Sequence, residues 1–204
     1  MSKKAYSEQE REQVGRDLLA VGLEMLSQRG LKDTTLQDIL KAVHISKTFF
    51  YGSFYPSLAE LVIGVINYQQ DLLLQMARRE AERPHLEERI GGFLRQVTYS
   101  RKHHFFVMTQ EEEVWLHRHL SREDFELFQS GQVLFYGQLL ALWNIPEEKC
   151  APMELGNLVL SIVLIYNSAA QSLPFFFPEE SERTAQAQIK ALTAYLVSLS
   201  DARE

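Results

Sequence analysis

The segment Ser46–Ser53 carries side chains whose chemistry suits contact with a nucleic acid. Lys47 can meet a phosphate or the edge of a guanine, and the hydroxyls of Thr48 and Tyr51 suit phosphate oxygens. Phe49 can lie against a thymine methyl group. Both rings have a second interpretation, because Phe49 and Tyr51 could instead fill the core of a small helical unit.

Two short helices joined by a tight turn are needed to position these side chains. Thr34, followed three residues later by Gln37, has the capping-box pattern of a helix start. Apolar residues then recur at the spacing of one helix face, at Leu36, Ile39, Leu40 and Val43. His44 and Ile45 form the turn, and Ser46 is suited to cap the second helix.

The second helix is expected to be anchored along one side only. Phe50 and Phe54 lie four residues apart and supply its core contacts, so the other side chains are predicted to face outward. Gly52 allows the backbone to approach a partner closely. Two helices joined by so short a turn, the second presenting hydroxyls, a lysine and rings, indicate a helix-turn-helix. The candidate DNA contacts are Thr34, Thr35, Gln37, Ser46, Lys47, Thr48, Phe49, Tyr51, Gly52, Ser53 and Tyr55.

A wider set of residues carries a resemblance to a known family, namely Gly30, Thr34, Thr35, Ile39, Ile45, Ser46, Lys47, Tyr51 and Phe54. This spaced set resembles the N-terminal DNA-binding domain of TetR/AcrR-type transcriptional regulators, over residues 11–70. The family usually has glycine where this chain has His44, and His is among the few other residues enriched at positive φ. The segment Tyr55–Leu58 lacks the lysine that usually follows the second helix and contacts a phosphate.

The resemblance implies an all-α protein in two parts. Residues 1–56 would form a three-helix DNA-binding helix-turn-helix domain, and residues 57–204 a larger helical domain for effector binding and dimerisation. The function implied is a ligand-responsive regulator, expected to be a repressor, which binds a palindromic double-stranded DNA operator as a homodimer. Its two recognition helices would enter successive major grooves about 34–36 Å apart. The alternative is a helical ligand-binding or scaffold protein that has lost DNA binding.

Charge and composition agree with an all-helical protein. Of the 204 residues 46% are apolar, and the 6 prolines lie between the periodic segments. A net charge of −6 at first argues against a nucleic-acid partner. However, residues 1–62 hold 8 Lys and Arg against 8 Asp and Glu, so the acidity belongs to the remainder, with 13 against 19.

Other features favour a soluble, cytoplasmic protein with no membrane partner. The single cysteine, Cys150, excludes an internal disulfide and fits a reducing compartment; a redox switch at this position is the alternative to a structural thiol. The N-terminal stretch MSKKAYSEQERE has no apolar signal segment. The most apolar run, Leu158–Tyr166, is too short to cross a bilayer.

Helical periodicity predicts the remaining elements. The expected helices are Ser7–Gly30, Ser57–Arg79, 86–102, Phe105–His119, Ser121–Trp143, Pro152–Leu173 and Ser181–Ser200, with a turn around Pro174 and Pro178. The helix that contains Leu158–Tyr166 is apolar nearly all round, so both of its faces need cover. In the resembled family the last two helices form the dimer interface, and these segments fit that role. A fully buried helix in a monomer is the alternative.

Aromatic and polar residues of the second part could line an effector pocket. Such a mixture suits a largely apolar or aromatic compound oriented by a few polar groups. The candidate effector contacts are Tyr99, His103, Trp115, Tyr136, Tyr166 and Asn167. The acidic run Glu111–Glu113 beside Trp115 could attract a cation, or it could be a solvated helix face. The same residues could equally be packed core.

Metal and enzyme chemistry has little support, so no cofactor and no catalytic residue are expected. Glu113 and His117 lie four apart and could share a metal on one helix face, with His103 completing a helical-bundle enzyme. A surface contact is the simpler interpretation of that pair. The chain also has no glycine-rich phosphate loop, no nucleophile elbow and no cysteine pair with metal-ligand spacing.

Overall fold

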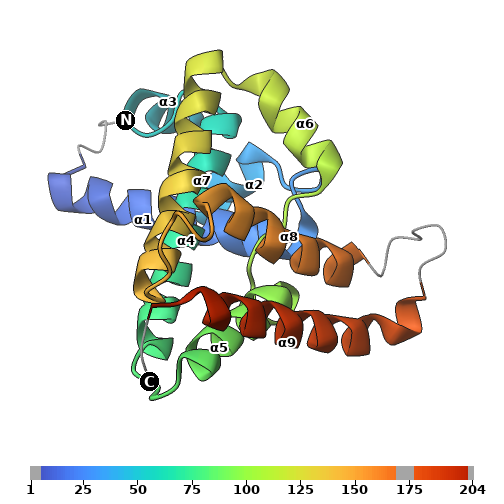
Figure 1. Cartoon of the computed structure of the whole chain (residues 1–204). Helices are drawn as coiled ribbons and strands as arrows, with labels where there is room; N and C mark the ends of the chain where they lie inside the picture. Colours follow the sequence, from blue (N-terminus) through green and yellow to red (C-terminus); the bar gives the residue numbers. More distant parts are fainter. Residues whose placement is uncertain (1–5, 169–176, 202–204) are drawn as a thin grey trace.

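The computed structural model describes residues 6–168 and 177–201, and all regular structure in these ranges is helical (Figure 1). The all-α prediction is therefore confirmed for the described part of the chain. The elements in order are α1 (Glu8–Arg29), α2 (Leu36–Ala42), α3 (Lys47–Ser53), α4 (Leu58–Glu80), α5 (Leu86–Thr98), η1 (Ser100–His103), α6 (Gln110–His119), α7 (Arg122–Leu142), α8 (Pro152–Ser168), η2 (Pro178–Glu180) and α9 (Ser181–Leu199).

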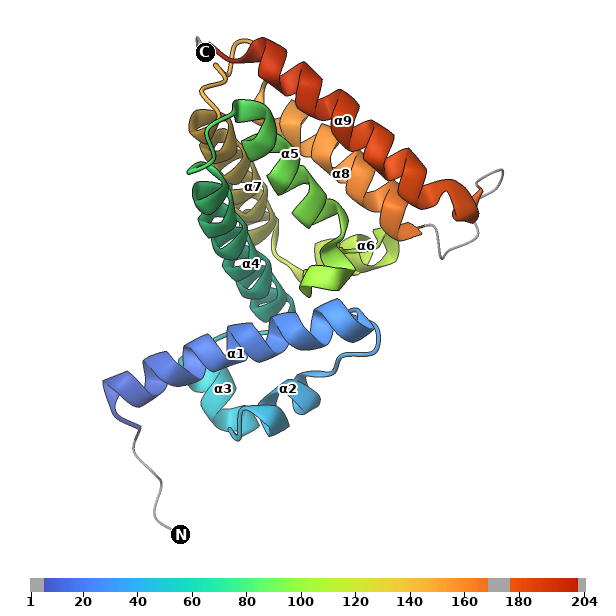
Figure 2. The same cartoon turned by 90° about the horizontal axis from the view of Figure 1, so that it is seen from below.

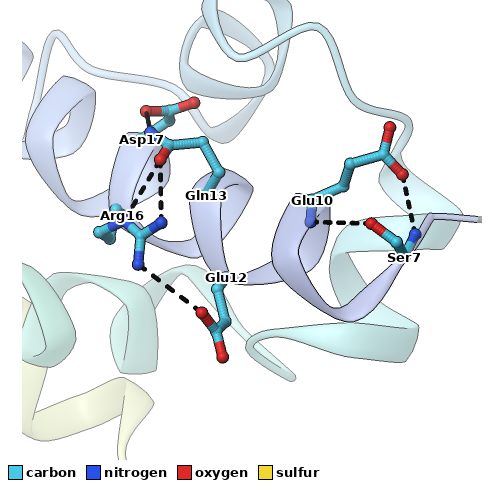
Figure 3. A network of polar contacts seen from close by, with 6 residues as sticks. All are labelled: Ser7, Glu10, Glu12, Gln13, Arg16 and Asp17. Atoms are coloured by element: carbon cyan, nitrogen blue, oxygen red, sulfur yellow. Dashed lines mark hydrogen bonds and ion pairs between the residues drawn. The ribbon is translucent and has the colours of Figure 1, made fainter.

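Side-chain caps fix where several helices begin. Ser7 accepts a hydrogen bond from the Glu10 amide at 3.2 Å, and the Glu10 carboxylate accepts one from the Ser7 amide at 2.8 Å. Figure 3 shows this capping box beside a polar network farther along α1. Ser46, Ser57 and Ser121 accept in the same way from the third residue of α3, α4 and α7. These four predicted starts are confirmed.

The start of α2 differs from the prediction by one residue. Thr35, not Thr34, is the cap: its hydroxyl accepts from the Asp38 amide at 3.2 Å, and Asp38 accepts back from the Thr35 amide. These hydrogen bonds from Thr35 lower the pKa of the Asp38 carboxyl. Thr34 is buried, and its hydroxyl donates to the Gly30 carbonyl at 2.7 Å. Thr34 is therefore not accessible for the DNA contact that the sequence predicts.

Two helix boundaries in the second half also differ from expectation. The helix predicted over 86–102 ends at Thr98 and is followed by the short helix η1. The helix predicted from Phe105 begins only at Gln110, because Thr109 and Glu112 form a capping box there. The end predicted at Leu173 and the turn at Pro174 fall outside the described residues.

The buried side chains form two apolar cores, which α4 joins. In Figure 2, α1, α2 and α3 lie at one end, and α5, α8 and α9 at the other. The first half of α4 packs into the first core, for example with Val62, and its second half into the second core, for example with Leu74. The first core also takes Phe106 and Leu116 from the later part of the chain. The two ends are thus physically linked by α4 and by the segment around α6.

No single helix among the described residues has the length and apolar character needed to cross a membrane. The pair α3 and α4, which is bent by 66°, has the combined length and composition of a membrane span, and no other described feature supports that interpretation. Within the same residues no three His, Cys, Asp or Glu side chains gather as metal ligands.

Candidate nucleic-acid interface

Helix α3 is held to the protein along one side. Phe50 is fully buried in the first core, and its carbonyl accepts the Phe54 amide at 2.9 Å. Phe54 is half-buried and packs against the same core. The other residues of α3, apart from Phe49, are free to face away from the protein because these two rings hold the helix in place.

The outward side of α3 is polar and accessible. Lys47, Thr48, Gly52 and Ser53 are exposed, and Tyr51 keeps 47% of its surface exposed although its ring edge meets Phe50. Ser46, Thr35 and Gln37 are also exposed. Eight of the eleven candidate DNA contacts are therefore exposed in the structure. They lie on α3, on its cap and at the start of α2.

Gly52 has no role in packing that explains its presence. A side chain at this position would meet no atom within 4 Å. Glycine inside a helix costs about 1 kcal/mol relative to alanine. Gly52 is therefore an open position on the outer side of α3.

Phe49 behaves differently from its neighbours. Its ring stacks on Tyr6 with 4.3 Å between centroids and meets Phe54 edge-on at 5.3 Å. These ring contacts leave Phe49 half-buried and less available for a thymine contact than its exposed neighbours. Tyr55 is half-buried too, which raises the pKa of its phenol, and its hydroxyl lies where a side chain at Gly64 of α4 would stand. Tyr55 therefore faces α4 with its polar end.

The turn between α2 and α3 has the backbone that the sequence predicts. His44 has φ of 58°, the left-handed conformation that favours glycine. Its amide donates to the Lys41 carbonyl at 3.3 Å, and the Ile45 amide donates to Leu40 at 3.1 Å. A helix end of this kind allows a connection of only four residues between α2 and α3.

A second candidate site is a cavity of about 320 Å³ between the helices of the second core. Its walls are mainly apolar and come from α4, α5, α7, α8 and the segment Phe105–Met108, with one residue each from η1 and α6. Its polar lining is Gln69, Gln70, Ser100, Gln132 and Tyr136, with Glu113 as the only charged lining residue among those described. The volume lies at the lower end of ligand cavities.

Two polar groups in the cavity are suited to orient a ligand. The Gln132 amide oxygen accepts from Gln70 at 2.8 Å, whereas its buried nitrogen has no hydrogen-bond partner among the described residues. Burial raises the pKa of Tyr136 to about 12, so this phenol stays neutral at physiological pH. Both groups can therefore form a hydrogen bond with an uncharged molecule.

The sequence located this cavity poorly, since only Tyr136 of the six candidate effector contacts lines it. Tyr99 and Tyr166 meet edge-on at 4.9 Å, and both donate to Glu182 of α9. Asn167 is buried and donates to the backbone carbonyls of Thr98 and Val163.

The other two candidates also lie elsewhere. His103 is exposed in η1, and Trp115 stacks on His119 beside a separate hollow near the start of α2. His117, from the metal hypothesis, packs its ring edge against Phe125 at 4.5 Å. The sequence missed Gln69 and Gln132, for which the signal was an amide inside an otherwise apolar helix face.

An exposed apolar stripe runs along α8. Met153, Leu160 and Leu164 keep 67%, 43% and 41% of their surface exposed, and their spacing puts them on one side of the helix. The adjoining surface of α9 presents Ala187, Ala191 and Tyr195. Glu154 is the single charged residue of Pro152–Ser168, and it accepts the Tyr195 hydroxyl at 3.2 Å. Large exposed apolar surfaces of this kind mark interaction sites.

Comparison with known proteins identifies no relative, so a functional interpretation depends on the geometry of the structure. A scan against protein-family models finds no match to this chain, and a search of curated proteins finds none. The structural features that bear on function are the polar outer side of α3, the apolar cavity and the exposed stripe of α8.

Proposed function

We propose that the protein is a ligand-responsive DNA-binding regulator of transcription that acts as a homodimer, in which α2 and α3 form the helix-turn-helix. The observation that carries this proposal is the outer side of α3: Lys47, Thr48 and Tyr51 are exposed on a short helix that Phe50 anchors from behind. Hydroxyls and a lysine on an anchored, protruding helix suit phosphate and base-edge contacts in the major groove.

The resemblance to TetR/AcrR-type regulators supports the same proposal. His44 takes the left-handed backbone at the position where that family usually has glycine, so the departure in residue type leaves the turn geometry intact. The missing lysine after α3 removes one phosphate contact. Among the described residues, α2 and α3 still present two exposed cations, Lys41 and Lys47.

The cavity of the second core is the proposed effector site, and its chemistry restricts the effector. No lysine, arginine or histidine is among the described residues that line it. Burying an anion without a cation is strongly unfavourable. The effector should therefore be a largely apolar molecule without negative charge, held by hydrogen bonds from Gln132 and Tyr136.

The dimer would form through the last two helices, α8 and α9, where the exposed apolar stripe and the alanines of α9 lie. Two copies of α3 would then enter successive major grooves about 34–36 Å apart on a palindromic operator. An effector that favours another spacing by about 1.4 kcal/mol lowers operator affinity tenfold. The expected outcome in the cell is repression that the effector relieves.

Selection of bound fragments from genomic DNA tests the function directly. The purified full chain should enrich a small set of fragments that share an inverted repeat, with half-sites one helical turn apart or a multiple of it. Electrophoretic mobility or fluorescence anisotropy at a stated salt concentration then measures affinity. Enrichment without any shared repeat, at the affinity of random fragments, would contradict the proposal.

The effector class is tested with two fluorescent dyes that differ by one charge. Phenylnaphthylamine is uncharged, and anilinonaphthalene sulfonate has the same rings plus a sulfonate. We expect the uncharged dye to bind at least tenfold more tightly, because the described lining of the cavity offers no cation to the sulfonate. Gln132→Lys should reverse that preference, whereas Gln138→Lys, on α7 outside the cavity, should leave it unchanged. Equal affinity for both dyes would argue against the proposed class.

A further inference from the structure

The segment Phe105–Thr109, here called the strap, connects the two apolar cores. It has no regular secondary structure and lies between η1 and α6. Phe105 and Val107 pack against the second core, whereas Phe106 and Met108 pack against the first. Successive side chains of the strap thus pack against different cores, so a shift of the strap disturbs both cores together.

The strap is also held to the wall of the cavity. The Gln69 side chain of α4 donates to the Phe106 carbonyl at 3.1 Å, and its oxygen accepts the Phe106 amide at 2.7 Å. Gln69 and the strap residues from Phe105 to Met108 all line the cavity. A molecule that fills the cavity therefore presses on the strap and on the side chain that holds it.

The strap leads directly into a buried carboxylate that holds the start of α2. Glu112 of α6 is 8% exposed, and its Oε1 accepts the Leu31 amide at 2.5 Å across 81 residues of sequence. Its Oε2 accepts the amide of Thr109, the last strap residue, at 2.7 Å. No ion pair to Glu112 occurs within the described residues. These two backbone amides are thus the hydrogen-bond donors that satisfy the buried oxygens of Glu112.

The other end of this contact is the loop that sets α2. Gly30 has φ of 75°, and a side chain on it would stand 2.9 Å from the Glu112 Oε1 atom. Leu31 is buried in the first core, and the loop then reaches Thr35, the cap of α2. The position of Leu31 therefore affects where α2 begins and, through the short turn, how α3 is presented.

We propose that Glu112 is the positioning residue through which the cavity controls α2 and α3. A molecule in the cavity displaces the strap, the strap moves α6 by way of Thr109, and Glu112 withdraws from the Leu31 amide. This inference rests on the proposed effector site, but it needs no DNA to be tested. The contact is a mechanical link between the cavity wall and the loop before α2.

Hydrogen exchange on the free protein tests the link in both directions. Glu112→Gln keeps the shape of the side chain but replaces one acceptor oxygen with a donor. It should speed exchange at least tenfold at Leu31 and, through the strap, also at Phe106. Gln69→Leu should do the reverse, speeding exchange at Phe106 directly and at Leu31 at a distance. Matched controls are Glu111→Gln, at an exposed neighbour on α6, and Gln70→Leu, at the adjacent cavity amide.

The reciprocal effect separates a link from a local contact. If each variant speeds exchange only at its own hydrogen bond, Glu112 is a local tether and the inference is wrong. It is equally wrong if the two control variants reproduce the distant effects, because loss of any charge or amide would then suffice. Neither result depends on whether the protein binds DNA, so failure of the proposed function remains distinguishable.

Discussion

Replacing Lys47 and Tyr51 together with alanine should weaken operator binding roughly 100-fold or more, without unfolding the protein. Side-chain contacts to bases or phosphates contribute about 1–3 kcal/mol each, and a dimer loses each contact twice. Both side chains lie on the outer side of α3, so little packing is lost. Anisotropy titrations on a selected operator measure the affinity, and the thermal midpoint should move by no more than about 4 °C.

A matched control removes a lysine that lies near the helix-turn-helix but not on α3. Lys32→Ala, at an exposed position in the loop between α1 and α2, should change affinity by less than about threefold. The single variant Lys47→Ala should also reduce the salt dependence of binding, by about one unit of slope for each subunit. Unchanged affinity in the double variant would remove α3 from the interface and with it the helix-turn-helix assignment.

Phe49 shows why residue type and spacing alone did not define this surface. In the sequence it is one aromatic among hydroxyls, at a position that helical spacing leaves outside the Phe50–Phe54 seam. In the structure the N-terminal Tyr6 stacks on it and Phe54 meets its edge. The partner that covers Phe49 is 43 residues away in sequence, and periodicity within one helix cannot predict such a partner.

Helix starts were predictable because their chemistry is local. A serine followed three residues later by a carboxylate satisfies free amides within one turn, whatever the rest of the chain does. The exception is informative, since Thr34 with Gln37 and Thr35 with Asp38 are overlapping patterns of the same kind. The hydroxyl of Thr34 donates instead to the Gly30 carbonyl of the same loop, four residues earlier, and Thr35 is left as the cap.

The cavity was not predictable because a void belongs to no single element. Tyr99, Tyr166 and Asn167 are all polar residues near apolar neighbours, but the first two meet Glu182 and the third meets backbone carbonyls. What lines the cavity depends on how seven segments pack, including a strap that the sequence placed inside a helix. Composition could therefore indicate an apolar site without identifying its walls.

The second large effect concerns the dimer. Met153→Arg together with Leu160→Arg should convert the protein from a dimer to a monomer, with a light-scattering mass near 23.6 kDa. An uncompensated charge buried at an interface costs several kcal/mol, and two-fold symmetry doubles the number of buried charges. A monomer presents one α3 instead of two, so operator binding should fall to the level of random DNA.

The matched control places the same two arginines, at the same spacing, on a different exposed pair of apolar residues. Leu127 and Leu134 of α7 are 72% and 63% exposed and lie beside α4, away from the stripe of α8. Leu127→Arg with Leu134→Arg should leave both mass and operator affinity unchanged if α8 carries the interface. A wild-type mass near one chain would contradict the dimer itself. Dissociation in the control alone would instead move the interface to α7, and the spacing of the two α3 helices would have to be derived from that face.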